Sequence, residues 1–203
     1  MKIIIIGAGY VGLVQAACLS DFGFEVICIE KDSKKIKQLN FGNVPFYEPR
    51  LSKILEKNIK NKRLKFTNQY DDNISNANVI FICVGTPAKR NIEQDLSYVK
   101  QASKEIASNL KDYTVIVLKS TVPIGTSKII ENIIKKINPN KLFDIVSNPE
   151  FLREGSAVDD FIRPEKIVIG CKSSKAETIL KKIYKPLNSS YIITNNETAE
   201  MIK

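Results

Sequence analysis

The chain has 203 residues, 43% of them hydrophobic and 26% charged, a composition ordinary for one large globular domain. Its net charge is +9, but the lysines are scattered over amphipathic stretches, so we expect a solvated basic surface and no nucleic-acid partner. No run reaches the roughly 20 apolar residues of a membrane-spanning helix, so no membrane partner is expected.

Short apolar runs alternate with segments of helical periodicity along the whole chain. This alternation predicts an α/β fold with a doubly wound, mostly parallel sheet and helices on both faces. Strands are expected at residues 2–6, 25–30, 64–67, 79–84, 113–119, 143–147, 166–170 and 191–194. Helices are expected at residues 11–22, 32–40, 51–60, 97–110, 127–137 and 173–183, and from 197 onward, the second of them capped by Asp32 or Ser33.

The four cysteines form no closely spaced pair, so we interpret them as small buried residues and predict no metal site. Residues 2–18 superficially resemble a lipoprotein signal, but three glycines interrupt its helix. A strand, turn and helix explain more of these residues. Because nothing demands an oxidising compartment, we expect a cytoplasmic protein.

Gly7, Gly9 and Gly12 lie between the first predicted strand and the helix after it, a context in which this spacing indicates a dinucleotide-binding turn. Gly7 permits the turn, Gly9 lets the backbone approach a pyrophosphate, and Gly12 allows close helix–strand packing. Glu30 ends the second strand, where its carboxylate can accept both ribose hydroxyls and repel a 2′-phosphate. The motif predicts a Rossmann-like domain that binds NAD and not NADP; a glycine turn without a ligand is the alternative.

Two further segments follow predicted strands and therefore lie at the same edge of the sheet. In CVGTP at 83–87, Gly85 and Thr86 are candidate cofactor contacts, although a plain turn explains this segment about as well. In KSTVPIGT at 119–126, Thr121 is a candidate for positioning a water or a substrate oxygen. Thr126 and Ser127 are expected to cap the helix that follows.

The run NPEFLREGSAVDDF at 148–161 places Glu150 and Glu154 just after an apolar strand. In a helix the two carboxylates would share one face, and a carboxylate near a reacting carbonyl can orient or deprotonate water. Arg153 would pair with a carboxylate or a phosphate. An acidic helix entry explains the spacing equally well. Because the chain contains no histidine, mechanisms that use a histidine base are excluded.

Seven segments together make the chain similar to the UDP-glucose/GDP-mannose dehydrogenase family. They are GAGYVG at 7–12, GNVPFYEPRL at 42–51, CVGTP at 83–87, KSTVPIGT at 119–126, NPEFLREGSAVDDF at 148–161, PEKIVIG at 164–170 and ETAEMIK at 197–203. Within the family, PFYEP and FLREGSAVDDF most resemble the UDP-glucose 6-dehydrogenases.

The resemblance implies oxidation of UDP-glucose to UDP-glucuronate with two NAD, through a cysteine thioester that water hydrolyses. It implies that Thr121 and Glu154 position this water, that Glu150 is a neighbouring acid, and that Lys203 stabilises the alkoxide or aldehyde oxygen. The implied substrate contacts are Glu150, Phe151, Leu152, Arg153 and Lys203. The implied cofactor contacts are Gly7, Gly9, Tyr10, Val11, Gly12, Glu30, Lys35, Thr86 and Thr121.

The family's nucleophilic cysteine has no counterpart here, because none of the four cysteines stands in a matching motif. The chain also ends inside a helical pattern. We therefore expect residues 1–196 to be the NAD-binding domain and 197–203 the truncated start of an interdomain helix, inactive alone. The resemblance implies a homodimeric parent protein and a monomeric fragment. A dehydrogenase of GDP-mannose or a UDP-aminosugar, and a stand-alone nucleotide-sensing module, are the alternatives.

Overall fold

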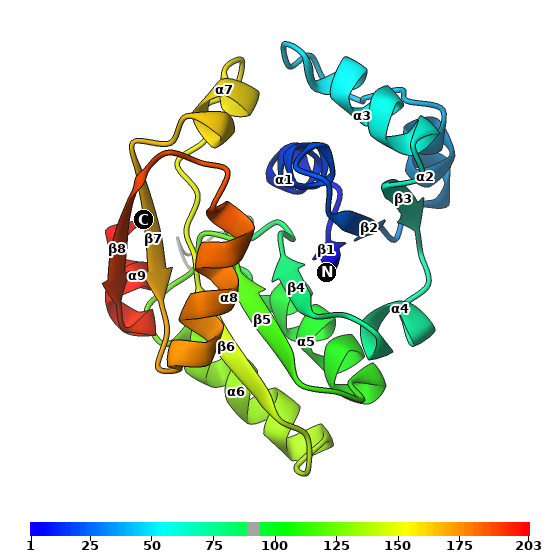
Figure 1. Ribbon diagram of the computed structural model, residues 1–203. Helices are drawn as coiled ribbons and strands as arrows, with labels where there is room; N and C mark the ends of the chain where they lie inside the picture. The colour runs from blue at the N-terminus through cyan, green and yellow to red at the C-terminus, as the bar shows by residue number, and fades with distance from the viewer. Residues whose placement is uncertain (89–93) are drawn as a thin grey trace.

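The computed structural model describes residues 1–88 and 94–203. In this part of the chain eight strands form one sheet in the order β3-β2-β1-β4-β5-β6-β7-β8 (Figure 1). The strands are β1 (Lys2–Ile6), β2 (Glu25–Ile29), β3 (Leu64–Thr67), β4 (Val79–Ile82), β5 (Thr114–Leu118), β6 (Phe143–Ser147), β7 (Lys166–Gly170) and β8 (Ser190–Thr194). The helices are α1 (Tyr10–Asp21), α2 (Ser33–Asn40), α3 (Leu51–Lys60), α4 (Asp71–Ser75), α5 (Ser97–Asn109), α6 (Thr126–Ile137), α7 (Ala157–Ile162), α8 (Ser174–Tyr184) and α9 (Asn196–Ile202).

The sheet is doubly wound, as predicted. The chain builds β1, β2 and β3 outward in one direction and then crosses back to build β4, β5 and β6 in the other. Neighbouring strands run parallel, except that β6 and β7 are antiparallel. The reversal places the carboxyl ends of β1 and β4 side by side, at the crevice where open α/β sheets bind ligands.

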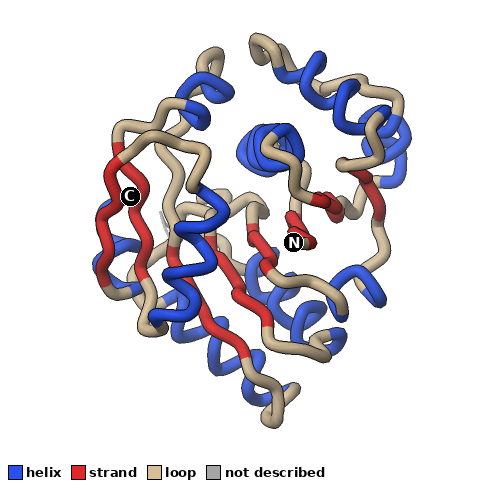
Figure 2. Tube along the Cα trace, in the orientation of Figure 1, coloured by secondary structure: helices blue, strands red, loops and turns tan. Residues whose placement is uncertain are grey.

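Two apolar cores lie on opposite faces of the sheet, because its central strands are buried on both sides. Ile3 and Ile5 of β1 belong to one core, and Ile4 and Ile6 belong to the other. The first core joins α1, α2, α3, α7 and α8 to the sheet, and the second joins α4, α5 and α6. Figure 2 shows this covering of the strands by helices on either side.

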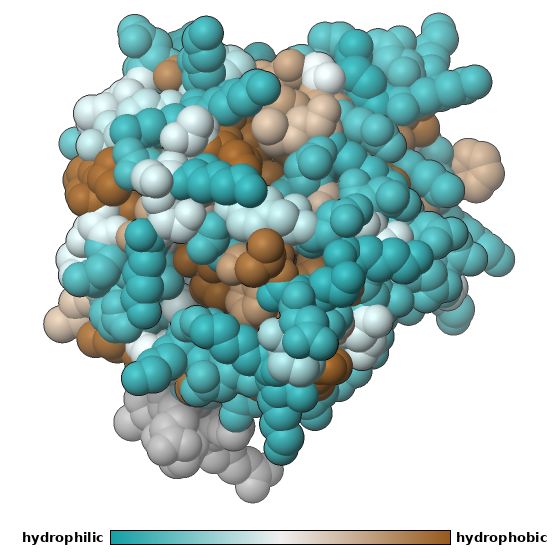
Figure 3. Space-filling model, turned by 60° about the horizontal axis from the view of Figure 1, so that its bottom comes forward, coloured by the Kyte–Doolittle hydropathy of each residue, from teal (hydrophilic) through white to brown (hydrophobic). Residues whose placement is uncertain are grey.

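Amphipathic helices turn their polar faces to the solvent. In α6, Ile130 and Ile134 are buried, whereas Lys135 and Lys136 are exposed. Figure 3 shows one face of the molecule, where hydrophilic residues dominate and hydrophobic areas are small and separated. In the described part of the chain, none of the helices has the length and apolarity needed to cross a membrane.

Element boundaries differ from the prediction by one or two residues, and three local details differ more. The short helices α4 and α7 are not predicted, because five and six residues are too few to display a helical period. Residues 150–153 are not helical, so Glu150 and Glu154 do not share a helical face. The prediction that Thr126 and Ser127 cap α6 is wrong: the N-cap residue is Gly125, which has no side chain. The Thr126 hydroxyl donates to the Pro123 carbonyl oxygen, and the Ser127 hydroxyl donates to Glu200. The predicted cap of α2 is confirmed, since Asp32 accepts hydrogen bonds from its first turn.

Candidate functional site

The glycine turn lies between β1 and α1, where a wider side chain would meet the protein's own backbone. Gly7 has φ +99°, in the left-handed region, and a Cβ on Gly12 would lie 1.9 Å from the carbonyl oxygen of Gly7. At Gly9, by contrast, φ is −70° and a Cβ would meet no described atom within 4 Å. The protein itself therefore requires glycine at 7 and 12, whereas at 9 the open space suits a ligand.

The first turn of α1 offers backbone N–H groups to this open space. Gly9 is the N-cap residue, and among residues 1–88 and 94–203 no side-chain cap accepts hydrogen bonds from the first-turn amides. Such unpaired N–H groups and the positive end of the helix dipole suit an anionic phosphate. The geometry therefore matches the pyrophosphate cradle that the glycine spacing predicts.

Glu30 lies directly after β2, beside the glycine turn. Its Oε2 accepts from the Ala8 amide at 3.3 Å and lies 3.3 Å from Nζ of Lys35. Burial alone would raise the pKa of Glu30, but the Asp32 amide and the positive charge of Lys35 lower it more. The carboxylate is therefore ionised, as ribose recognition requires. The ion pair with Glu30 also holds Lys35 beside the glycine turn.

Thr86 and Thr121 meet at the neighbouring strand ends. The Thr86 hydroxyl donates to the carbonyl oxygen of Thr121 at 2.7 Å, which joins the segment after β4 to the segment after β5. Ser120 adds a second link, since its hydroxyl donates to the carbonyl oxygen of Val84 at 2.6 Å. The two predicted threonines thus lie together at the carboxyl edge of the sheet.

Glu150 and Lys203 form an ion pair, although 53 positions separate them in sequence. Nζ of Lys203 lies 2.7 Å from Oε1 of Glu150 and also donates to the Glu150 carbonyl oxygen at 2.7 Å. The Leu152 amide donates to the other carboxylate oxygen at 2.6 Å. Both side chains are mostly buried, with 11% of Glu150 and 22% of Lys203 exposed. The ammonium group of Lys203 and the carboxylate of Glu150 are therefore held together after the carboxyl end of β6.

Helix α9 brings Lys203 to this point because two buried polar side chains fasten it. Asn196 accepts from the Ser147 amide at 3.0 Å and donates to the Ile145 carbonyl oxygen, both in β6. Glu200 accepts from the amides of Gly125 and Ser127 at 2.6 and 2.7 Å, and from the Ser127 hydroxyl. The carboxylate that caps α6 therefore comes from α9, 73 residues away, where a local sequence rule cannot find it.

Arg153 pairs with a carboxylate, one of the two partners expected for it. Its guanidinium lies 2.6 Å from Asp160, and its amide donates to the same carboxylate at 2.9 Å. The Arg153 hydrogen bond is the main reason why the pKa of Asp160 lies below its usual value. Glu154 follows on the turn 153–156 and is exposed to solvent.

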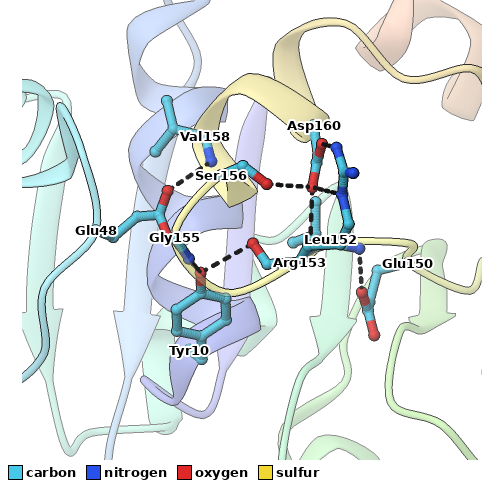
Figure 4. Close-up of polar contacts among 9 residues, drawn as sticks. All are labelled: Tyr10, Glu48, Glu150, Leu152, Arg153, Gly155, Ser156, Val158 and Asp160. Carbon is cyan, nitrogen blue, oxygen red and sulfur yellow. Dashed lines mark hydrogen bonds and ion pairs between the residues drawn. The ribbon is translucent and has the colours of Figure 1, made fainter.

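Tyr10 does not present its hydroxyl to the crevice. The hydroxyl donates to the carboxylate of Glu48, accepts from the Gly155 amide at 3.0 Å and lies 3.2 Å from the Arg153 carbonyl oxygen (Figure 4). Burial and hydrogen bonding to Glu48 raise the pKa of Tyr10 to about 12. Glu48 is the residue that sequence reasoning misses, because its segment matches the family without indicating what the carboxylate contacts.

A hollow of about 460 Å³ lies beside the run 150–153. The run itself lines it, together with Arg163, Lys166 and three buried polar residues, Lys119, Asn148 and Tyr184. Nζ of Lys166 lies 5.5 Å from the centre of the Phe151 ring, and Nζ of Lys203 lies 5.6 Å from it. Four basic residues, Lys119, Arg153, Arg163 and Lys166, and three acidic ones, Glu150, Asp160 and Glu165, thus line a partly apolar cavity large enough for a small ligand.

The four cysteines are free thiols. Cys18, Cys28 and Cys83 are buried, and burial is the main cause that raises the pKa of each thiol. Cys171 is half-buried, and burial raises the pKa of its thiol as well. Among the described residues no group of three or more histidine, cysteine, aspartate or glutamate side chains could hold a metal ion.

Comparison with known proteins identifies the family. The profile described as UDP-glucose/GDP-mannose dehydrogenase family, NAD binding domain, matches residues 1–188. The chain belongs to this family. It is 46% identical to the UDP-glucose 6-dehydrogenase of Rhizobium meliloti (strain 1021) and 47% identical to UDP-glucose 6-dehydrogenase TuaD of Bacillus subtilis (strain 168). Both alignments cover all of this chain but only 48% and 44% of the relative, so the chain spans about half the length of the enzymes it matches.

Solved structures of the family share the fold closely. A ternary complex of GDP-mannose dehydrogenase from Pseudomonas aeruginosa superposes with a TM-score of 0.97 at 37% identity, over all of this chain and 48% of the other. A UDP-glucose dehydrogenase from Pyrobaculum islandicum superposes with a TM-score of 0.95 at 31% identity, over 99% of this chain and 48% of the other. The fold is therefore the Rossmann-like NAD-binding fold predicted from the sequence.

NAD is the cofactor of this family domain, and the residues of this chain fit it. The space at Gly9 and the uncapped amides of α1 suit the pyrophosphate, and the ionised Glu30 suits a ribose. The individual cofactor contacts, Val11 and Lys35 among them, stay predictions.

Proposed function

We propose that the chain is the NAD-binding part of an NAD-dependent nucleotide-sugar 6-dehydrogenase that oxidises UDP-glucose to UDP-glucuronate. The observation that carries the proposal is the ion pair of Glu150 and Lys203, because Glu150 also lines the neighbouring hollow. The two UDP-glucose 6-dehydrogenases at 46% and 47% identity favour this substrate over GDP-mannose, whose dehydrogenase is 37% identical.

The ammonium group of Lys203 has one role in this proposal: to stabilise negative charge on the sugar oxygen at C6. Glu150 fixes its position, since it accepts the ion pair with its carboxylate and a hydrogen bond with its carbonyl oxygen. NAD, when bound, supplies the hydride acceptor. Such preorganised charge acts without reorganisation during the reaction, and this is how electrostatic catalysis gains its strength.

Thr121 and Glu154 are proposed to orient the water of the hydrolytic step. Thr121 lies after β5 and is tied to Thr86, whereas Glu154 lies on the turn 153–156. A hydroxyl and a carboxylate supplied from two segments can hold one water by two hydrogen bonds and accept its proton. The thiol that forms the thioester belongs, in this proposal, to a part of the protein outside these 203 residues.

The hollow beside residues 150–153 is the proposed place of the nucleotide sugar. Glu150 and Asp160 in its lining are paired with Lys203 and Arg153, which leaves Arg163 and Lys166, opposed by Glu165, to bind an anionic diphosphate. Phe151 and Leu152 add apolar surface. In this proposal residues 1–196 form the NAD-binding domain, and residues 197–203 begin a helix that joins it to a second domain. The complete protein is proposed to be a homodimer.

Replacing Gly9 by alanine tests the dinucleotide site. We expect Gly9→Ala to weaken NAD binding at least about tenfold, because its methyl group enters the space of the pyrophosphate. Its midpoint of thermal unfolding should stay near that of the wild type, since no described atom contacts the added carbon. Calorimetric titration with NAD and circular dichroism measure the two effects.

The matched variant is Gly12→Ala, whose methyl group meets the backbone of Gly7 and should destabilise the fold itself.

Absence of any heat of binding at millimolar NAD in the wild-type chain would contradict the cofactor site. Product analysis of the longer protein with UDP-glucose, GDP-mannose and a UDP-aminosugar decides the substrate.

A further inference from the structure

Glu48 is a buried carboxylate in the family-matching segment 42–51, and no role has been assigned to it above. Glu48 is 5% exposed and lies in the irregular segment between α2 and α3. Among the described residues no lysine or arginine forms an ion pair with it. A buried carboxylate in such surroundings is held by hydrogen bonds, and these connect it to two distant segments.

The first connection runs to the turn 153–156 and the start of α7. Oε2 of Glu48 accepts from the Gly155 amide at 2.9 Å, and Oε1 lies 3.3 Å from the Val158 amide that donates to it. Figure 4 shows the carboxylate pointing at this turn, with one oxygen toward each amide. Glu154 precedes one of these amides directly, so the path of the backbone at Glu154 depends on Glu48.

The second connection runs to the dinucleotide turn. Tyr10 lies in the first turn of α1, and its hydroxyl donates to Oε2 of Glu48 while accepting from the Gly155 amide. The Tyr10 ring also contacts Phe46 of the same segment, with 4.9 Å between ring centroids. One carboxylate therefore joins the phosphate-binding helix end to the turn that carries Glu154.

We propose that Glu48 is a positioning residue that couples NAD binding to the placement of the Glu154 turn. The inference rests on the proposed function. We call the hydrogen bonds of Glu48 to Tyr10, Gly155 and Val158 the Glu48 clamp. When these bonds are formed, the turn 153–156 and the N-terminus of α1 are already ordered before NAD binds, so binding does not have to order them. When the Glu48 clamp is broken, part of the NAD-binding free energy goes into ordering these segments, so NAD binds more weakly. Because coupling is reciprocal, the Glu154 turn is then also held less firmly by bound NAD.

Glu48→Gln tests the coupling. The carboxylate of Glu48 has two acceptor oxygens, whereas the glutamine amide has one. The NH₂ group of the glutamine would therefore face either the Gly155 amide or the Val158 amide, and the hydrogen bond on that side would be lost. We expect hydrogen exchange at the Gly155 and Val158 amides to accelerate, and NAD to bind at least about fivefold more weakly. Amide exchange read by mass spectrometry and calorimetric titration with NAD report the two effects on the same chain.

Asp159→Asn is the matched control, because Arg50 and Asp159 join the same two segments through an exposed ion pair at 2.6 Å. Exposed pairs contribute little, so this variant should change NAD affinity by less than about twofold. Glu48→Asp keeps the charge but shortens the reach, and it should give an intermediate loss; it replaces Glu48→Gln in the titration if that variant does not fold.

The outcomes separate the inference from the function on which it rests. If the wild-type chain does not bind NAD, the proposed function and the coupling both fail. If the wild type binds NAD and Glu48→Gln binds it equally well while amide exchange accelerates, Glu48 only fastens the fold, and the coupling alone is overturned. Unchanged exchange at Gly155 and Val158 would show that Glu48 does not hold the turn, which also overturns it.

Discussion

Lys119 carries an ammonium group into the interior at the carboxyl end of β5. In the part of the chain that the structure describes, its hydrogen bonds go to two neutral groups, Oδ1 of Asn148 at 3.0 Å and the Tyr184 hydroxyl at 3.4 Å. The Tyr184 hydroxyl donates to the same amide oxygen at 2.6 Å. Burial lowers the pKa of Lys119 to about 8, although the charge of Glu150 acts in the opposite direction. The network fixes Asn148, two positions before Glu150.

A lysine with a lowered pKa makes stability depend on pH with a definite sign. Between the folded pKa of about 8 and the ordinary 10.5, the unfolded chain holds the proton and the folded chain releases it, so stability rises with pH. The free energy of unfolding of the wild type relative to Lys119→Met should therefore rise by on the order of 2 kcal/mol between about pH 7 and about pH 9.5.

Urea unfolding of the two chains at both pH values measures this difference. The exposed substitution Lys111→Met serves as the control for the rest of the chain. A constant difference between the wild type and Lys119→Met would mean that Lys119 stays charged in the folded protein.

At the scale of elements, α9 contributes two different things. It carries Lys203 to Glu150, and through Glu200 it supplies the cap that α6 lacks in its own sequence. Glu200 is buried and accepts three hydrogen bonds, so its removal leaves the amides of Gly125 and Ser127 without a partner. The docking of α9 and the start of α6 thus stabilise each other.

We expect Glu200→Ala to lower the free energy of unfolding by about 2–3 kcal/mol, because a buried charged acceptor is lost. Glu197→Ala, on the exposed face of the same helix, should cost less than about 1 kcal/mol. Urea unfolding followed by circular dichroism compares the two. Equal effects would mean that Glu200 is not the cap of α6.

At the scale of the whole molecule, the sheet gathers segments from both halves of the chain around one crevice. Burial raises the pKa of all four thiols, and none of the four lies in the run 148–153. A thioester route needs a thiolate near the sugar. The family's relatives are about twice as long as this chain, which leaves room for the nucleophile elsewhere.

The 203-residue chain should therefore bind NAD but form no UDP-glucuronate from UDP-glucose. Chromatographic analysis of the nucleotide sugars after incubation with NAD measures this, with UDP-glucose 6-dehydrogenase TuaD of Bacillus subtilis as the positive control. UDP-glucuronate formed by the 203 residues alone would show that the acid is made without the thiol we place outside them.

Much of the fold follows from patterns that are local in sequence. The apolar run of β1, the spacing of Gly7, Gly9 and Gly12, and Glu30 at the end of β2 predict the dinucleotide crevice, because strand, turn and helix form among neighbours. The short helix α4 and the antiparallel placement of β7 against β6 escape prediction, since neither leaves a periodic signature.

The sequence by itself determined the α/β alternation, the glycine turn and the cofactor, because each depends on side-chain periodicity or on a contiguous motif. Only the tertiary structure decided that Glu200 caps α6, that Lys203 meets Glu150, and that Glu48 joins Tyr10 to Gly155. These partners lie between 38 and 107 positions apart, and a buried carboxylate takes whichever donors the folded chain brings to it. No local rule specifies those donors, since they exist only once the sheet and its helices have packed.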